Sequence, residues 1–175
     1  MERKNVVLIG MPASGKSTVG VILAKLLGYD FIDTDLLIQR REGRTLSRII
    51  ADEGVDGFPA VEDDVCAALE AKHAVIATGG SAVYGERGMR NLRRQGTVVY
   101  LEVDYPALVG RLRDVKGRGV ALREGQTLRM LYDERVRLYR RYADLTIPER
   151  GLDLEQTVAA VYDALAARIG RGEDD

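Results

Sequence analysis

The stretch Gly10–Ser17 reads GMPASGKS and fits the pattern G-x-x-x-x-G-K-[ST] of a phosphate-binding loop. The apolar run Val6–Ile9 precedes it, and a segment with helical spacing, Ser17–Leu27, follows it. A strand, a loop and a helix in this order suit phosphate binding, because backbone N–H groups of the loop and the N-terminus of the helix attract phosphate oxygens. The stretch therefore predicts that the chain binds a nucleoside triphosphate.

Side chains in and just after this loop have distinct expected tasks. We expect Lys16 to reach the β- and γ-phosphates and the Ser17 hydroxyl to ligate Mg²⁺. The other expected contacts with the nucleotide come from the rest of the loop and the first helical turn: Gly10, Ala13, Ser14, Gly15 and Thr18.

The composition limits the class of protein. With 175 residues, of which 46% are hydrophobic, the chain suits one domain with a sizeable core. A formal charge of -1 offers no basic field for nucleic acid, and no apolar stretch approaches the roughly 20 residues of a membrane span. We therefore expect a single cytoplasmic domain over residues 1–175, monomeric, that binds a small molecule and neither nucleic acid nor membranes.

Apolar runs of strand length alternate with segments of helical spacing along the chain. The expected strands are Val6–Ile9, Tyr29–Ile32, Ala74–Ala77, Thr97–Leu101 and Leu145–Ile147. The expected helices are Ser17–Leu27, Leu46–Asp52, Val61–Lys72, Glu86–Gln95, Pro106–Asp114, Thr127–Tyr142 and Leu154–Ile169. Near-continuous apolar strands between helices predict an α/β fold, a parallel sheet with helices on both faces and ligands at the carboxyl ends of the strands.

Two segments interrupt this alternation. Residues 33–62 are too long and too polar for one crossover helix, and we expect a small appended helical subdomain that binds the substrate. Residues 114–126 read DVKGRGVALREGQ, and their length and glycines predict a mobile lid, although an ordinary exposed loop has a similar composition. Within the lid, Arg118 stands between two glycines, where it can move over the phosphates and stabilise transferring charge.

Two polar stretches directly follow expected strands, at the edge of the sheet where ligands bind. Asp33 and Asp35 follow the second strand; one can hold Mg²⁺ and the other can accept a hydrogen bond from an attacking hydroxyl. Either aspartate could also cap a helix. Gly79 and Gly80 follow the third strand and allow the backbone to approach a ligand closely, although paired glycines also occur in plain turns.

Taken together, these motifs resemble those of shikimate kinases, within the nucleoside monophosphate kinase group of P-loop proteins. The matching pieces cover nearly the whole chain: GMPASGKST, FIDTD, GRTLSRII, ATGGS, VVYLE, RGVAL and ER..LY..YAD. The resemblance implies a three-layer α/β/α P-loop sandwich with a five-stranded parallel sheet. It also implies that ATP with Mg²⁺ phosphorylates a ring hydroxyl of shikimate, giving shikimate 3-phosphate in aromatic amino-acid biosynthesis.

The resemblance assigns roles to single residues. It implies that Lys16, Asp35 and Arg118 are catalytic, that Ser17 and Asp33 are associated with the metal, and that Arg111 lies against the adenine. Arg118 would also contact the nucleotide. The residues implied at the substrate are Asp35, Gly79, Gly80, Ser81 and Arg135, of which Arg135 would hold the substrate carboxylate. Helical spacing alone would equally allow Arg135 to be a surface residue paired with Glu134 or Asp133.

Three positions depart from the pattern of this family. Ala13 replaces a glycine of the phosphate loop, which implies some backbone strain, and Ser81 replaces the third glycine of the substrate stretch. Pro59 stands where the family has an arginine that clamps the substrate carboxylate. A hydrogen bond to a charged group is worth about 1.5–3 kcal/mol, or roughly ten- to a hundredfold in affinity. Arg48 is a candidate to replace that arginine.

These departures keep other functions open. A kinase for a different small hydroxylated metabolite, such as a hydroxy acid, a sugar acid or homoserine, would keep the same reacting residues. A regulatory module that binds nucleotide without turnover is a second alternative, against which the intact Lys16, Asp33 and Asp35 argue. A regulatory GTPase is disfavoured because the sequence contains no N-K-x-D guanine signature.

Overall fold

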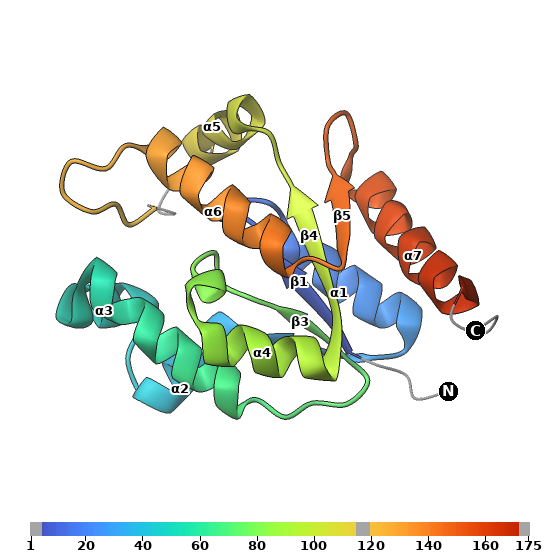
Figure 1. The fold of residues 1–175 in the computed structure, drawn as a ribbon, viewed down its shortest axis with the longest axis horizontal. Coiled ribbons are helices and arrows are strands. Elements are labelled where there is room, and N and C mark those ends of the chain that lie inside the picture. Colours follow the sequence, from blue (N-terminus) through green and yellow to red (C-terminus); the bar gives the residue numbers. More distant parts are fainter. Residues whose placement is uncertain (1–4, 115–119, 172–175) are drawn as a thin grey trace.

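The structure is a computed structural model that describes residues 5–114 and 120–171. Within these ranges, parallel strands form one five-stranded sheet in the order β2-β3-β1-β4-β5, of which Figure 1 labels β1, β3, β4 and β5. The strands are β1 (Asn5–Ile9), β2 (Asp30–Asp33), β3 (Ala74–Ala77), β4 (Gly96–Glu102) and β5 (Leu145–Pro148). Each expected strand is present, with ends that differ by one residue at most.

Helices connect the strands as the alternation predicts. They are α1 (Lys16–Leu27), α2 (Thr34–Glu42), α3 (Leu46–Ala68), α4 (Glu86–Gln95), α5 (Tyr105–Asp114), α6 (Leu128–Tyr142) and α7 (Leu154–Arg171), with a short 3-10 helix, η1 (Ala82–Tyr84), after β3. Among the described residues, no helix is both long enough and apolar enough to cross a membrane.

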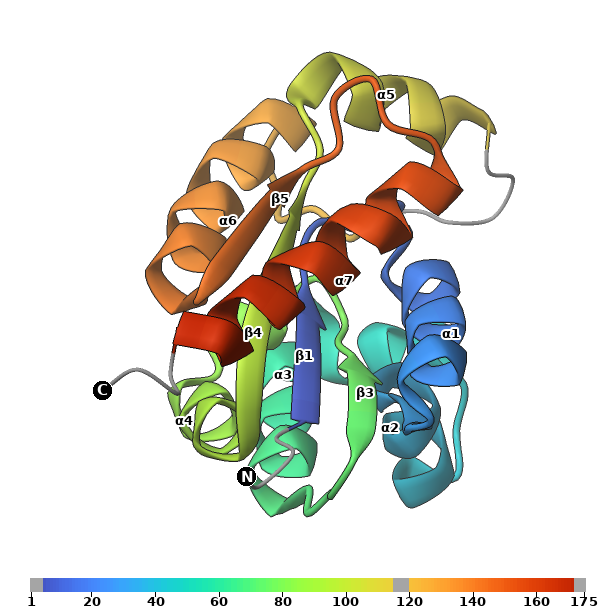
Figure 2. The ribbon, with the colours of Figure 1, turned by 90° about the vertical axis from the view of Figure 1, so that its right-hand side faces the viewer.

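Helices cover both faces of the sheet, because alternate residues of each strand point to opposite sides. Val6 and Leu8 pack with residues of α1 and α7 on one face, and Figure 2 shows these two helices lying across it. Val7 and Ile9 belong to the other core, to which α3, α4 and α6 contribute. The predicted three-layer α/β/α sandwich is confirmed.

The register of the strands brings three carboxyl ends to one edge of the sheet. Ala77 pairs with Leu8 of β1 and with Asp33 of β2, so these strands end at the same level. The phosphate loop after β1, the aspartates after β2 and the glycines after β3 therefore leave the sheet side by side. This is the edge at which open α/β sheets bind ligands.

The segment 33–62 contains more helix than expected. The helix α2 lies within the segment expected to be helical, although no separate range was given for it, and the expected Leu46–Asp52 and Val61–Lys72 belong to one element, α3, which ends at Ala68. This element bends at Gly54, where φ is 77° and ψ is 170°, and Pro59 follows in the helical turns after the bend. A proline lacks the N–H that a helix interior uses, so helical spacing in the sequence does not predict a helix across it.

A small separate core holds α2 against α3. It consists of Ile38, Ile49, Phe58 and Val65, apart from the two cores that flank the sheet. The assignment of residues 33–62 to a substrate-binding subdomain, and of residues 114–126 to a lid within one domain, stays a prediction. Of that second segment, residues 120–126 are described, and they form neither helix nor strand.

Candidate active site

The phosphate loop, residues 10–17, requires backbone conformations that favour glycine. Gly10 has a φ of 150°, and a Cβ atom there would lie 2.7 Å from the carbonyl oxygen of Leu101. Gly15, directly before α1, has a φ of 83°. Ala13 has a φ of 64°, a conformation that costs a residue with a side chain about 1–2 kcal/mol. The strain that alanine implies at this position is therefore present.

Lys16 turns its amine into the loop. Its Nζ donates hydrogen bonds to the carbonyl oxygens of Gly10 and Met11, both at 2.7 Å, and lies 3.3 Å from Ser14 Oγ. Burial lowers the pKa of this amine to about 8, while the charge of Asp35 acts in the opposite direction. A nearby phosphate would favour the charged form of Lys16 and raise that pKa, so the site suits an anion.

Asp33 and Asp35 serve different neighbours, because the chain turns from β2 into α2 between them. Asp33 Oδ1 accepts the backbone N–H of Asp35 at 2.9 Å, so it is Asp33 that caps α2. Asp33 Oδ2 accepts the Ser17 hydroxyl at 3.1 Å. A hydroxyl beside a carboxylate fits Mg²⁺, which binds few protein oxygens and keeps waters and phosphate oxygens as its other ligands. The described residues contain no group of three or more His, Cys, Asp or Glu that could hold a metal.

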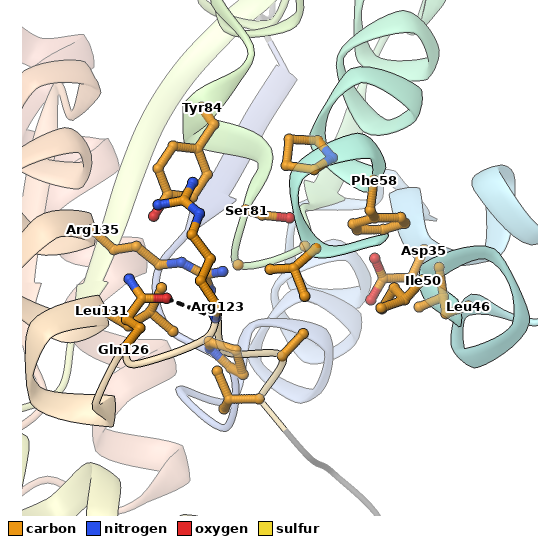
Figure 3. Close-up of a pocket in the computed structure, with 17 residues that line it drawn as sticks. Asp35, Leu46, Ile50, Phe58, Ser81, Tyr84, Arg123, Gln126, Leu131 and Arg135 are labelled. Carbon is orange, nitrogen blue, oxygen red and sulfur yellow. Dashed lines mark hydrogen bonds between the residues drawn. The ribbon is translucent and has the colours of Figure 1, made fainter. Parts of the chain in front are cut away.

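A cavity of about 180 Å³ opens beside the phosphate loop, whose Pro12 forms part of its wall. Figure 3 shows Asp35 and Phe58 on one side of this cavity, and Arg123 and Arg135 on the other. Side chains from α2, α3, η1 and α6 line it, together with residues 79–81 and part of the segment 120–126. A small molecule in the cavity would therefore lie next to a phosphate held by the loop.

Gly79 and Gly80 let several charged side chains approach one another at this cavity. A Cβ atom on Gly79 would lie 2.9 Å from Asp35 Oδ1 and would also clash with Glu62 Oε1. On Gly80 it would lie 2.9 Å from a terminal nitrogen of Arg135. The close approach expected from the paired glycines thus involves protein side chains that surround the cavity.

Glu62 on α3 is a buried carboxylate that the sequence analysis missed. Its Oε2 accepts the Ser81 hydroxyl, while Oε1 has no hydrogen-bond partner within the described part of the chain. Burial raises the pKa of Glu62 to about 7, although the Ser81 hydrogen bond acts in the opposite direction. The available signal was its position four residues after Phe58, which places both side chains on one face of a helix. This signal applies only if the helix continues across Pro59.

Arg135 on α6 is 8% exposed, so the alternative of a surface residue is wrong. Its guanidinium carbon lies 5.6 Å from the centroid of the Tyr84 ring, and its buried Nε has no hydrogen-bond partner among the described residues. Tyr139, on the same helix, donates from its hydroxyl to the Gly80 carbonyl at 2.6 Å and holds the glycine segment after β3 against α6. Arg135 is therefore a buried cation in the wall of the cavity.

Arg111 on α5 lies beside the phosphate loop. Its Nη1 donates to the carbonyl oxygen of Ala13 at 3.2 Å and to Glu149 at 2.8 Å. Glu149, which the sequence analysis did not single out, is 5% exposed, and burial raises its pKa. The contact with Ala13 places Arg111 beside the phosphate loop, and its position against the adenine stays a prediction.

The remaining predicted residues have mixed outcomes. Pro59 lines the cavity and can offer it no hydrogen-bond donor. Arg48 does not replace the missing arginine: its side chain is 70% exposed, and its Nε lies 3.1 Å from Asp52 on the same helix. Thr18 is an exposed residue of the first turn of α1. Arg118 lies outside the described residues.

Comparisons with known proteins agree with this geometry. The family model for shikimate kinase matches residues 12–166. The shikimate kinase of Salinispora arenicola (strain CNS-205) is 41% identical over 163 residues, which are 92% of this chain and 97% of that protein. That of Symbiobacterium thermophilum is 37% identical over 96% of this chain and 99% of its own length. The solved structure of shikimate kinase from Acinetobacter baumannii in complex with shikimate has a TM-score of 0.84 at 33% identity, covering 94% of both chains.

Proposed function

The chain belongs to the shikimate kinase family, and from this premise we propose that it transfers the γ-phosphate of ATP to shikimate. Shikimate kinases are phosphotransferases that use ATP with Mg²⁺, so the chain is an enzyme of this class. One observation carries the proposal: a carboxylate, Asp35, and a buried cation, Arg135, line one cavity beside the phosphate loop. Shikimate offers hydroxyls to the first and a carboxylate to the second.

In the proposed reaction, the oxygen of one shikimate hydroxyl attacks the γ-phosphorus of ATP. The bond between that phosphorus and the oxygen bridging to ADP breaks, and shikimate 3-phosphate and ADP form. Asp35 orients the hydroxyl and accepts its proton, which then passes to solvent. Lys16 stabilises the negative charge on the β- and γ-phosphates, and Arg118, as the sequence predicts, adds a second cation.

Ser17 and Asp33 are the residues that would hold Mg²⁺. The metal supplies charge neutralisation for the phosphate oxygens when it is bound. Asp33 is suited to this role because its other oxygen caps α2, which holds the carboxylate in one orientation. The same cap starts the helix that carries Asp35, so one residue orients both the metal side and the acceptor side of the site.

Pro59 favours a second candidate, a kinase of the same mechanism for a different hydroxy acid, because it lines the cavity without offering a donor. The two candidates separate when purified protein is supplied with MgATP and shikimate, a sugar acid, a short hydroxy acid or homoserine, and ADP is followed. We expect shikimate to give the highest kcat/KM. If shikimate gives no more ADP than buffer while another alcohol does, the assignment of shikimate as the acceptor is wrong, and the assignment of the protein as a kinase stands. If no alcohol raises ADP, the regulatory alternative is supported.

Other expectations from the sequence stay predictions. They are a monomeric state, a cytoplasmic location, and the absence of nucleic-acid and membrane partners. Light scattering of the purified protein with and without MgATP checks the first of them.

A further inference from the structure

A second arginine, Arg123, reaches the acceptor cavity from the segment between α5 and α6. Of the described residues that line this cavity, Arg123 and Arg135 are the cations, and Asp35 is the carboxylate. Figure 3 shows the two arginine side chains near Tyr84 and Asp35 across the cavity from them. The cavity is therefore polarised, with positive charge on the α6 side and negative charge on the α2 side.

Tyr84 connects the two arginines. The guanidinium carbon of Arg135 lies 5.6 Å from the Tyr84 ring centroid. The Tyr84 hydroxyl donates to Glu134 Oε1 at 2.5 Å, and the same oxygen lies 3.7 Å from Arg123 Nη1. Glu134 therefore offsets part of the positive charge of Arg123, and a carboxylate in the cavity would be attracted by both arginines.

The present partners of Arg123, Glu134 and Asp56, are exposed carboxylates that a ligand can displace; the Glu134 side chain, 3.7 Å from Arg123 Nη1, is 41% exposed. Arg123 Nε donates to Asp56 Oδ1 at 2.7 Å, but the side chain of Asp56 is 81% exposed. Ion pairs of such exposed groups contribute little to stability, so Asp56 keeps Arg123 near the cavity without holding it strongly. Arg135 is different: it is buried, and its Nε has no hydrogen-bond partner among the described residues.

From these contacts we infer that Arg123 determines substrate specificity by binding, together with Arg135, the carboxylate of the acceptor. The inference rests on the proposed function, since it takes the acceptor to be a carboxylic acid. A planar guanidinium offers paired N–H donors that match the two oxygens of a carboxylate. Pro59 on the facing helix α3 supplies no donor, so the second cation of the cavity comes from the segment before α6 instead.

The test compares shikimate with its methyl ester, which keeps the hydroxyls and removes the negative charge. We expect Arg123→Met to raise the KM for shikimate roughly ten- to a hundredfold, the range of one charged hydrogen bond, with kcat changed less. The same variant should leave kcat/KM for the ester nearly unchanged, and Arg123→Lys should recover part of the loss. Arg129→Met is the matched control, because Arg129 is an exposed arginine of α6 that pairs with Asp133.

Asp56→Asn separates substrate binding from a purely structural contact between Arg123 and α3. If Arg123 binds the carboxylate, this variant leaves the KM for shikimate unchanged or lowers it. The inference is overturned if Asp56→Asn reproduces the loss seen in Arg123→Met, or if Arg123→Met affects shikimate and its ester equally. A wild-type enzyme inactive on shikimate overturns the proposed function alone. In that case, the role of Arg123 is tested with the acceptor that is found, by comparing the effect of Arg123→Met on kcat/KM for the acid and for its methyl ester.

Discussion

The phosphate loop and the acceptor cavity lie side by side but are built in different ways. The loop comes from one contiguous stretch, residues 10–17, and its key side chain, Lys16, bonds to carbonyl oxygens of the same stretch. The cavity takes side chains from α2, α3, η1, α6 and the segment 120–126, which are far apart in the sequence.

This difference explains where the chain can vary. A change in the loop alters the geometry of every phosphate contact, and Ala13 is accommodated only with a strained backbone. A change in the cavity can be compensated by a side chain of another element. The Ser81 hydroxyl, for example, donates a hydrogen bond to Glu62 on α3. The reacting side of the site therefore allows little change, whereas the side that selects the acceptor allows more.

The largest effect is expected from Asp35→Asn, at the boundary between the two regions. Loss of the carboxylate that accepts the hydroxyl proton should lower kcat about 10²- to 10⁴-fold, while the neutral isostere keeps the fold. Steady-state kinetics with shikimate measures this. Asp30→Asn, at the exposed start of β2, is the control. Activity within a few-fold of the wild type would remove Asp35 from the proposed mechanism.

Lys16→Met should lower kcat about 10²- to 10³-fold, because a cation that stabilises the transferring phosphate is lost. Stability should respond differently. Burial lowers the pKa of Lys16 from its usual 10.5 to about 8, so its charge opposes folding below about pH 8. Thermal unfolding at pH 7 should therefore show no loss of stability in Lys16→Met. A melting temperature that falls with activity would indicate a structural role, and Lys25→Met on the exposed face of α1 is the control.

Pro59→Arg tests whether the cavity lacks a donor on the α3 side. The added guanidinium should lower the KM for shikimate by about tenfold, as one new hydrogen bond to a charged group would. Pro59→Gln restores a similar length without charge and should do much less. Equal effects of the two variants would mean that removal of the proline, and not the added charge, is responsible.

Glu62→Gln should change how stability depends on pH. In the wild type, burial raises the pKa of Glu62 from 4.5 to about 7, so the folded state keeps a proton that the unfolded state releases between these values. The free energy of unfolding that this group contributes is present below about pH 4.5 and is lost as the pH rises to 7.

Glutamine has no proton to release, so the difference in unfolding free energy between Glu62→Gln and wild type should grow by more than about 1 kcal/mol from pH 5 to pH 8. Urea unfolding at several pH values measures this, with Ser81→Ala as a companion that removes the hydrogen bond to Glu62. Parallel pH profiles for the variant and the wild type would show that Glu62 does not titrate in this range.

The smallest effect is expected from Ala13→Gly in the phosphate loop. Glycine removes the strain at φ 64° but adds freedom to the unfolded chain, so the net gain in unfolding free energy should be about 0.5–1 kcal/mol. His73→Gly, at the other described non-glycine residue with a positive φ (52°), provides the comparison outside the site. No gain at Ala13 would mean that contacts within the loop already compensate for the strain.

The sequence by itself determined the sheet and the phosphate loop, because these depend on local signals. Near-continuous apolar runs mark buried parallel strands, and a contiguous motif carries its own geometry. The sequence could not show that Asp33 caps α2 while Asp35 faces the cavity. The chain changes from strand to helix between these two residues, and this change points their carboxylates in different directions.

Only the tertiary structure decided what surrounds the acceptor. Helical spacing does not extend across Pro59, so Glu62 was missed. Arg48 was a candidate to replace the missing arginine, and its exposed ion pair with Asp52 rules it out. Arg123 and Arg135 line the same cavity as side chains from α2 and α3, which are distant in the sequence. No local sequence pattern predicts that these residues come together. A contiguous motif forms the site for the phosphate that is transferred. The choice of the molecule that receives it depends on side chains that only folding brings together.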